Sequence, residues 1–186
     1  MKFKIDGNPS FSHIKFVLSP GDSITTESDA MASMDTDIDH KTAFNGGFFK
    51  GLLKKFLGGE SLFINHYTNN SDKDQEIVIT QPTPGEIHAV KLEGRGMYLQ
   101  PGSYICSTPD VHLVLEWAGI RSFIAREGLF RLYVGGKGVV WFGGYGRILE
   151  RDLDGETLTD TSHLLAYEPS INLNIQLSGG LVSSLM

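Results

Sequence analysis

Histidines are the residues of this chain best suited to binding a metal or transferring a proton, and there are six: His13, His40, His66, His88, His112 and His163. A metal-dependent enzyme of the cupin type needs two histidines separated by one residue, a nearby glutamate and a further histidine on a facing strand. None of the six has another histidine two positions away, and His112 in particular lacks such a partner. The spacing therefore predicts no metal site, and we predict no cofactor.

Nucleophilic catalysis also lacks its motif. A serine hydrolase with a nucleophile elbow carries Gly-x-Ser-x-Gly at a strand-to-helix turn, and the sequence does not contain that pattern. Scattered Ser, His and Asp residues do not define a triad by themselves. We expect His66 and His163 to lie in strands with their ring nitrogens hydrogen-bonded, and we predict no catalytic residue.

Two glycine-rich stretches resemble phosphate-binding loops. They are Gly135-Gly136-Lys137-Gly138 and Gly143-Gly144-Tyr145-Gly146. Neither ends in Lys-Ser or Lys-Thr, and neither stands between a strand and a helix, which is the context that directs backbone amides at phosphate. Hairpin turns and close backbone approaches explain these glycines better. Trp141 and Tyr145 have faces able to stack on a base, but without a neighbouring cluster of positive charge we predict that they pack in the core.

Composition limits the partners and the compartment. The chain has 186 residues and a formal net charge of −6, which argues against general nucleic-acid binding because phosphate affinity rests on clustered Lys and Arg. The single cysteine, Cys106, excludes an internal disulfide and a cysteine-rich zinc site, and we expect it to be a small strand residue. The sequence begins without the pattern of a secretory signal or an organelle transit peptide. We therefore expect a cytoplasmic protein.

One amphipathic stretch is the candidate contact site. Between Gly46-Gly47 and Gly58-Gly59, apolar residues recur at helical spacing and lysines occupy the remaining arc. We expect residues 46–58 to be a peripheral contact element that either packs over one end of the core or docks on a partner or a lipid surface. Its predicted contact residues are Phe48, Phe49, Lys50, Leu52, Leu53, Lys54, Lys55 and Phe56.

Short apolar runs separated by turn residues predict an all-β protein. The expected strands are 16–18, 30–35, 61–68, 76–80, 86–92, 97–99, 111–116, 128–134, 137–142 and 171–177. Hairpins are expected across 81–85 and across Gly135-Gly136, and the strict alternation in 171–177 is the clearest strand signal in the chain. Only the amphipathic stretch and residues 118–126 have a pattern compatible with a helix.

An internal repeat is visible in the positions that follow three glycines, Gly21, Gly102 and Gly155. Apolar residues recur at matching offsets after each of them, as in Ile24, Ile105 and Leu158. Each unit is expected to contain a tight turn, a short strand, a polar corner and a second strand, with Gly21 and Gly102 in equivalent turns at positive or otherwise restricted backbone angles. These units divide a single domain, residues 1–186, into pseudo-repeats of about 12–96, 97–146 and 147–186.

Three blocks of the sequence carry a resemblance to a known family. They are NGGFFKGLLKKFLGGESLFINHYT, GMYLQPGSYICSTPDV and GKGVVWFGGYGRILERDLDGETLTDTSHLLAYEPSI. Their order resembles the mitochondrial biogenesis family called altered inheritance of mitochondria, number twenty-four, and its bacterial relatives. The resemblance implies an all-β fold like that of the tryptophan RNA-binding attenuation protein, related to double-stranded β-helices. It implies no chemistry, although mitochondrial members are associated with inner-membrane organisation.

The last residues resemble the beginning of the amphipathic stretch. Residues 178–186 repeat the glycine-led pattern of residues 45–53, so we expect the third repeat to be incomplete, either as a natural short variant or as a truncated product.

Taken together, these features predict pseudo-repeated antiparallel strand pairs in a β-sandwich or double-stranded β-helix-like arrangement, with one short amphipathic segment. We expect a non-enzymatic scaffolding or binding protein that forms homo-oligomers through exposed strand edges and makes weak peripheral membrane or protein contact. The alternative is a cupin-like metal-dependent enzyme.

Overall fold

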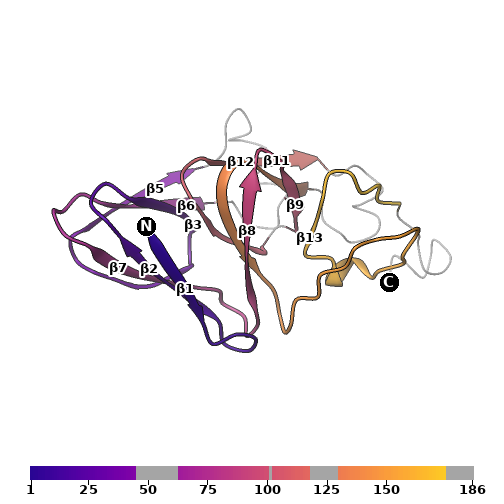
Figure 1. Cartoon of the computed structure of the whole chain (residues 1–186), viewed down its shortest axis with the longest axis horizontal. Coiled ribbons are helices and arrows are strands. Elements are labelled where there is room, and N and C mark those ends of the chain that lie inside the picture. The colour runs from indigo at the N-terminus through magenta and orange to yellow at the C-terminus, as the bar shows by residue number, and fades with distance from the viewer. Residues whose placement is uncertain (45–62, 101, 118–129, 175–186) are drawn as a thin grey trace.

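A computed structural model of the chain describes residues 1–44, 63–100, 102–117 and 130–174 (Figure 1). Thirteen strands and one 3-10 turn make up its regular structure within those residues, so the all-β prediction is confirmed. In chain order they are β1 (Lys2–Asp6), β2 (His13–Leu18), β3 (Ser23–Glu27), β4 (Met31–Met34), β5 (Ile38–Phe44), β6 (Phe63–Asn69), β7 (Gln75–Thr80), β8 (Ile87–Glu93), β9 (Met97–Leu99), β10 (Tyr104–Ser107), β11 (Val111–Trp117), β12 (Phe130–Gly143), η1 (Thr161–His163) and β13 (Ala166–Tyr167).

The strands form two antiparallel sheets. The smaller sheet has the order β1-β2-β7-β4. The larger one runs β13-β9-β12-β10-β3-β6-β5, with β8 and β11 also paired to β12. Strands β1 and β5 were not predicted. Residues of β5 lack apolar alternation, whereas those of β1 do alternate, with Phe3 and Ile5 between charged residues, and this short signal was overlooked.

Period-two alternation explains how the small sheet meets the large one. Ile14, Phe16 and Leu18 on β2 are buried, and they alternate with residues that are more exposed. The register places Ile14 opposite Ile79 and Phe16 opposite Ile77 on β7, so one face of the sheet is apolar. That face packs into a core with Ile24, Tyr67 and Trp141.

Strand β12 is the centre of the large sheet. Its first half pairs with β9 and β11, and its second half pairs with β8 and β10 (Figure 1). The predicted hairpin at Gly135-Gly136 is therefore wrong, because the strand continues through both glycines. Glycines in this strand allow neighbouring segments to approach its backbone closely. A Cβ on Gly136 would overlap the carbonyl oxygen of Asp110, and a Cβ on Gly138 would overlap the hydroxyl of Thr108.

A second core lies along the first half of β12. It contains Leu99, Leu132 and Val134 among its buried residues, with Ile148 and Ala166 packed against it. The two cores are connected through β12, because Val140 belongs to one and the neighbouring Trp141 to the other.

The predicted hairpin between residues 76–80 and 86–92 is also wrong. Strand β7 lies in the small sheet, between β2 and β4, whereas β8 lies in the large sheet on β12. The intervening prolines, Pro82 and Pro84, carry the chain from one sheet to the other. The proline-containing stretch between these two strands therefore marks a crossing between sheets, not a hairpin turn.

The glycine prediction is confirmed at both positions. Gly21 has φ of 85° and Gly102 has φ of 88°, and Gly155 has φ of 89°. Strands β3 and β10 also pair symmetrically: Thr25 lies opposite Ser107, and Thr26 lies opposite Cys106. With the offset 102−21=81, Thr25 corresponds to Cys106 and Thr26 to Ser107, so the register of these two pairs is symmetric with respect to that offset. Division of the whole chain into three units remains a prediction.

The third unit differs from the expected turn and strand pair. Residues 147–160 contain no strand, and only η1 and the two-residue β13 follow. The strand predicted at 171–177 is wrong for 171–174, which form no strand, and the rest lies outside the described residues. Alternation fails here because a strand forms only where another strand is available for pairing.

Candidate functional site

The predicted contact element lies outside the described residues. This applies to residues 46–58 as a whole and to all eight predicted contact residues, Phe48, Phe49, Lys50, Leu52, Leu53, Lys54, Lys55 and Phe56. The same is true of residues 118–126 and of residues 178–186.

The histidines are dispersed over the fold. His66 lies in β6 with Nδ1 2.9 Å from Thr25 Oγ1, as predicted. The Nδ1 atom of His163 lies 3.0 Å from Ser162 Oγ, as predicted, but the residue lies in η1, so its placement in a strand was wrong. His40 stacks on Tyr67 at a ring distance of 4.9 Å. Among the described residues, no three His, Cys, Asp or Glu side chains lie close enough to hold a metal ion.

The only thiol of the chain is buried. Cys106 lies in β10 and is fully buried, which confirms its prediction as a strand residue. Burial raises the pKa of the Cys106 thiol, and it also raises the pKa of the neighbouring Tyr104 hydroxyl. Because a nucleophilic cysteine needs a lowered pKa and access to substrate, Cys106 has the environment of a packing residue.

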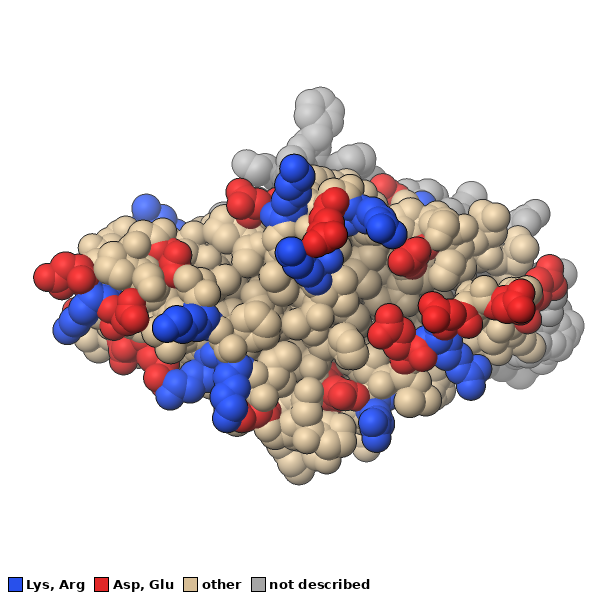
Figure 2. Space-filling model, viewed as in Figure 1, with Lys and Arg blue, Asp and Glu red and all other residues tan. Residues whose placement is uncertain are grey.

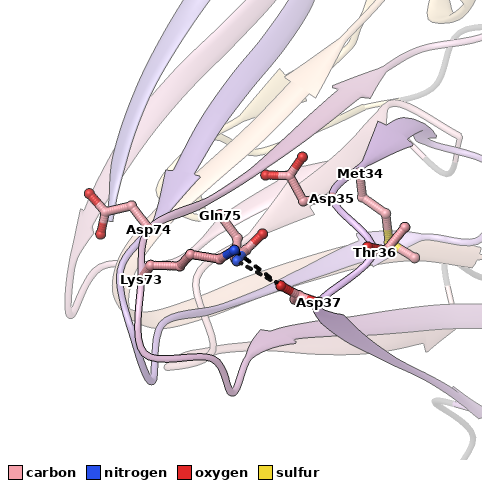
Figure 3. A pocket seen from close by; sticks show the side chains of 7 residues that line it. All are labelled: Met34, Asp35, Thr36, Asp37, Lys73, Asp74 and Gln75. Atoms are coloured by element: carbon pink, nitrogen blue, oxygen red, sulfur yellow. Dashed lines mark hydrogen bonds and ion pairs between the residues drawn. The ribbon is translucent and has the colours of Figure 1, made fainter.

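A polar pocket of about 420 Å³ opens beside the end of β4 (Figure 3). Lys73 and Gln75 both point at Asp37: Lys73 Nζ and Gln75 Nε2 each lie 3.5 Å from Asp37 Oδ2. Asp35 accepts a hydrogen bond of 2.7 Å from the backbone N–H of Glu76. The lining has three aspartates, Asp35, Asp37 and Asp74, against the single cation of Lys73, so the pocket is acidic. Its one ion pair is solvent-exposed, and pairs of this kind contribute little stability.

Three tyrosines form a row across the outer face of the large sheet. The register aligns Tyr167 on β13, Tyr98 on β9 and Tyr133 on β12. Arg131 lies over the Tyr98 ring, with Cζ 4.0 Å from its centre, and its Nη2 donates to Glu116 Oε2 at 3.1 Å. Burial and the hydrogen bond to Glu116 raise the pKa of Tyr98. These groups satisfy one another, which suits a stabilising cross-strand cluster.

An apolar groove of about 350 Å³ forms where three connections meet. We call it the aromatic groove; it is lined by Pro9, Ser10, Phe11, Pro84, Gly85, Tyr145, Gly146 and Arg147. Phe11 is 75% exposed and Tyr145 is 84% exposed. The prediction that Tyr145 packs in the core is therefore wrong, whereas Trp141 is fully buried as predicted. Exposed aromatic rings beside an apolar hollow are typical of contact surfaces.

Backbone contacts hold the aromatic groove together. Gly85 forms parallel bridges with Phe11 on one side and Gly146 on the other. A Cβ on Gly85 would overlap the carbonyl oxygen of Gly144, so only glycine fits. The Asn8 side chain donates to Ile87 O and accepts from Ile87 N, both at 3.2 Å, and so fixes the adjoining loop to β8. The groove therefore has a rigid floor.

No sequence motif pointed to this groove. Its aromatic residues are separated by more than a hundred positions, and they meet only because the β1–β2 connection packs beside the ends of β8 and β12. The one available signal was the glycine-rich stretch 143–146, whose close backbone approach was predicted correctly. Tyr145 was misjudged because the sequence does not show on which side of that approach its ring lies.

Comparison with known proteins places the chain in a family of β proteins. The family model described as Mitochondrial biogenesis AIM24 matches residues 3–186. This chain therefore belongs to the Mitochondrial biogenesis AIM24 family, which confirms the resemblance carried by the three sequence blocks.

Two individual similarities come from Streptococcus pyogenes. An uncharacterised protein of serotype M6 is 27% identical over 194 residues, covering 100% of this chain and 77% of that protein. An X-ray crystal structure of a structural genomics target from the same species has a TM-score of 0.78 and 25% identity, covering 99% of this chain and 83% of that one. The fold is thus shared with an experimentally determined structure.

The described residues contain no helix that is both long and apolar enough to cross a lipid bilayer.

Proposed function

We propose that this protein is a non-enzymatic scaffolding or binding protein that works as a homo-oligomer. The observation that carries the proposal is the set of open strand edges. Within the described residues, the seven-residue β5 pairs only with β6, and the seven-residue β8 pairs only with β12. Unpaired backbone N–H and C=O groups along such edges favour pairing with another chain.

Both ends of the β8 edge are covered, the first by the Asn8 side chain on Ile87 and the last by an ion pair. Lys91 and Glu93 form an ion pair of 3.0 Å near the end of the strand. The stretch between these two ends, His88 to Val90, carries no lysine, glutamate or proline that would discourage pairing. A partner strand is therefore expected to join there.

Sedimentation velocity over a wide range of protein concentration tests this proposal. We expect a defined oligomer whose population rises with concentration, because association follows mass action. A monomer at every concentration up to the millimolar range would refute the self-association on which the proposal depends.

Weak membrane or protein contact through residues 46–58 is part of the proposal. The apolar and basic pattern of Phe48 to Phe56 supports it, since interfacial anchors combine an apolar face with lysines. In the double variant Leu52→Asp and Phe56→Asp, we expect an unchanged melting temperature and loss of co-sedimentation with anionic vesicles at low salt. Failure of the wild type to co-sediment would eliminate membrane contact.

The remaining parts of the proposal follow from charge and cysteine usage. We propose a cytoplasmic location, supported by a single buried thiol, and no general nucleic-acid binding, supported by the net charge of −6. On the face drawn in Figure 2, lysines and arginines are interspersed with carboxylates. Metal analysis of the purified protein separates this proposal from the cupin-like alternative, for which we expect a bound transition metal and loss of the fold in chelator.

A further inference from the structure

The segment after the aromatic groove has unusual exposure. We call residues 149–159 the arm; every one of them is exposed, and Leu149, Leu153 and Leu158 are 75%, 48% and 84% exposed. Within the described part of the chain, the arm makes no hydrogen bond, ion pair or ring contact. Three leucines held in water favour a partner surface that covers them.

Both ends of the arm are fixed to the protein. At its start, Ile148 N donates to Glu86 Oε2 at 2.9 Å, and the Ile148 side chain packs against the second core. After its end, Gln100 N donates to Leu165 O at 2.8 Å, which fixes the following segment to the chain beside β9. The arm is therefore a loop presented outward from two anchors (Figure 1).

The charges of the arm and the aromatic groove are complementary. The arm has four carboxylates and one guanidinium, a net charge of 1−4=−3. Arg147 lines the groove, and none of the ion pairs found among the described residues involves it. An apolar hollow with an arginine at its rim suits a segment in which leucines alternate with acidic residues.

The arm of one molecule does not occupy its own groove, because its leucines are exposed. Only Ile148 separates Arg147 from the start of the arm, so arm and groove are neighbours on the surface. A twofold axis beside that junction would bring each arm across the other groove, and such a reciprocal contact is what a symmetric dimer requires. Because both of its ends are anchored, the arm can reach outward by at most half of its extended length, about 18 to 20 Å.

We propose that two copies of this chain associate by exchanging these elements, with Leu149, Leu153 and Leu158 of each arm seated on the aromatic groove of the other copy. Phe11 and Tyr145 form its apolar contacts, and Arg147 faces the acidic residues of the incoming arm. In Figure 2, the lowest part of the molecule, where the β1–β2 connection and the start of β8 lie in Figure 1, carries mainly uncharged surface. This inference rests on the proposed self-association and names its surface.

Sedimentation equilibrium of matched variants tests the exchange. The arm variant (Leu149→Ser, Leu153→Ser and Leu158→Ser) and the groove variant (Phe11→Ser and Tyr145→Ser) should each weaken association by at least about tenfold, as loss of anchoring contacts does. The control, Leu173→Ser, replaces an exposed leucine outside both elements and should associate like the wild type. Melting temperatures close to the wild type show that each variant is folded.

Charge reversal tests the pairing itself. Arg147→Glu should weaken association, and adding Glu150→Lys, Asp152→Lys and Asp154→Lys to the same chain should restore it. Restoration supports the contact between arm and groove; absence of restoration overturns it. If the wild type associates and the arm and groove variants associate equally well, only this inference fails and a strand edge carries the oligomer. If the wild type is monomeric, the proposed function fails as well.

Discussion

The two-sheet body and the arm differ in what their apolar residues contact. In the body, Phe16 and Ile77 face each other across β2 and β7 and are fully buried. In the arm, the apolar side chains of Leu149 and Leu158 are exposed to solvent instead of packing in a core. The body has therefore gained its hydrophobic stabilisation within one chain, whereas the arm can gain it only from another surface.

This contrast shows why hydrophobic residues alone do not define a core. Burial of a leucine side chain contributes about 1.5 to 3 kcal/mol, but only where other apolar groups surround it. The body and the arm should accordingly respond to substitution in opposite ways: folding depends on the body, and association depends on the arm. The predictions below test that division, beginning with the largest expected effect on stability.

Trp141→Ala should lower the free energy of unfolding by about 3 to 5 kcal/mol, since it leaves a large cavity in the first core. Its ring is fully buried and makes edge contacts with Phe3 and Phe16 at 4.9 and 5.0 Å. Urea denaturation measures the loss. Tyr145→Ala is the control four residues later and should change stability by less than about 0.5 kcal/mol. Equal losses would contradict the distinction between body and groove.

Gly85→Ala should destabilise the protein by about 2 kcal/mol or more, because the added Cβ meets the backbone oxygen of Gly144. Gly102→Ala should cost only about 1 kcal/mol, since φ is positive but the space around it is open. Thermal melts compare the Gly85→Ala and Gly102→Ala variants.

Gly21→Ala should destabilise the protein as much as Gly102→Ala does, and a clear difference between these two variants would count against equivalent turns.

Stability should fall at alkaline pH because of Cys106. Burial raises the pKa of this thiol in the folded protein, so between the unfolded and folded pKa values the unfolded chain binds fewer protons. The contribution is complete below the unfolded pKa of about 8.5 and is lost as pH rises above it, at up to about 1.4 kcal/mol per pH unit. The buried Tyr104 adds a similar loss above about pH 10.

Urea denaturation between pH 7 and pH 9.5 measures this slope. Cys106→Ala should remove the part that begins near the thiol pKa, so its curve should run flatter over this interval. An unchanged slope in the variant would show that other groups determine the alkaline loss.

The smallest effect on monomer stability belongs to the arm. Replacing Leu149, Leu153 and Leu158 with serine should change the unfolding free energy of the monomer by no more than about 0.5 kcal/mol each, because exposed side chains lose no packing. Chemical denaturation at a concentration too low for association isolates this effect. A loss of several kcal/mol would mean that the arm packs on its own chain.

The sequence predicted strands best where alternation reflects a buried face. The expected strands at 76–80, 86–92, 97–99 and 111–116 lie within a residue of β7, β8, β9 and β11. Their partners were harder to predict: the β7 and β8 segments were assigned to one hairpin but belong to different sheets. Local sequence records which residues are buried, whereas pairing depends on contacts between distant segments.

Glycines caused the other main error in the fold. Gly21 and Gly102 were correctly placed at turns, whereas Gly136 lies within a continuous strand and allows Asp110 to approach. A glycine at a turn and a glycine at a close contact have the same appearance in the sequence. For the same reason, the aromatic groove was not predicted, since Phe11 and Tyr145 meet only after the sheets have formed.

Hydrogen–deuterium exchange of the wild type at two concentrations tests the central claim most directly. In dilute solution, amides of β12 should be strongly protected, and amides of residues 149–159 should exchange at the rate of an unstructured chain. At a concentration where the dimer forms, the amides of the arm and of residues 10–11 and 145–147 should gain protection together. If the dimer forms while the arm continues to exchange freely, or if the arm is already protected in the monomer, the account is contradicted.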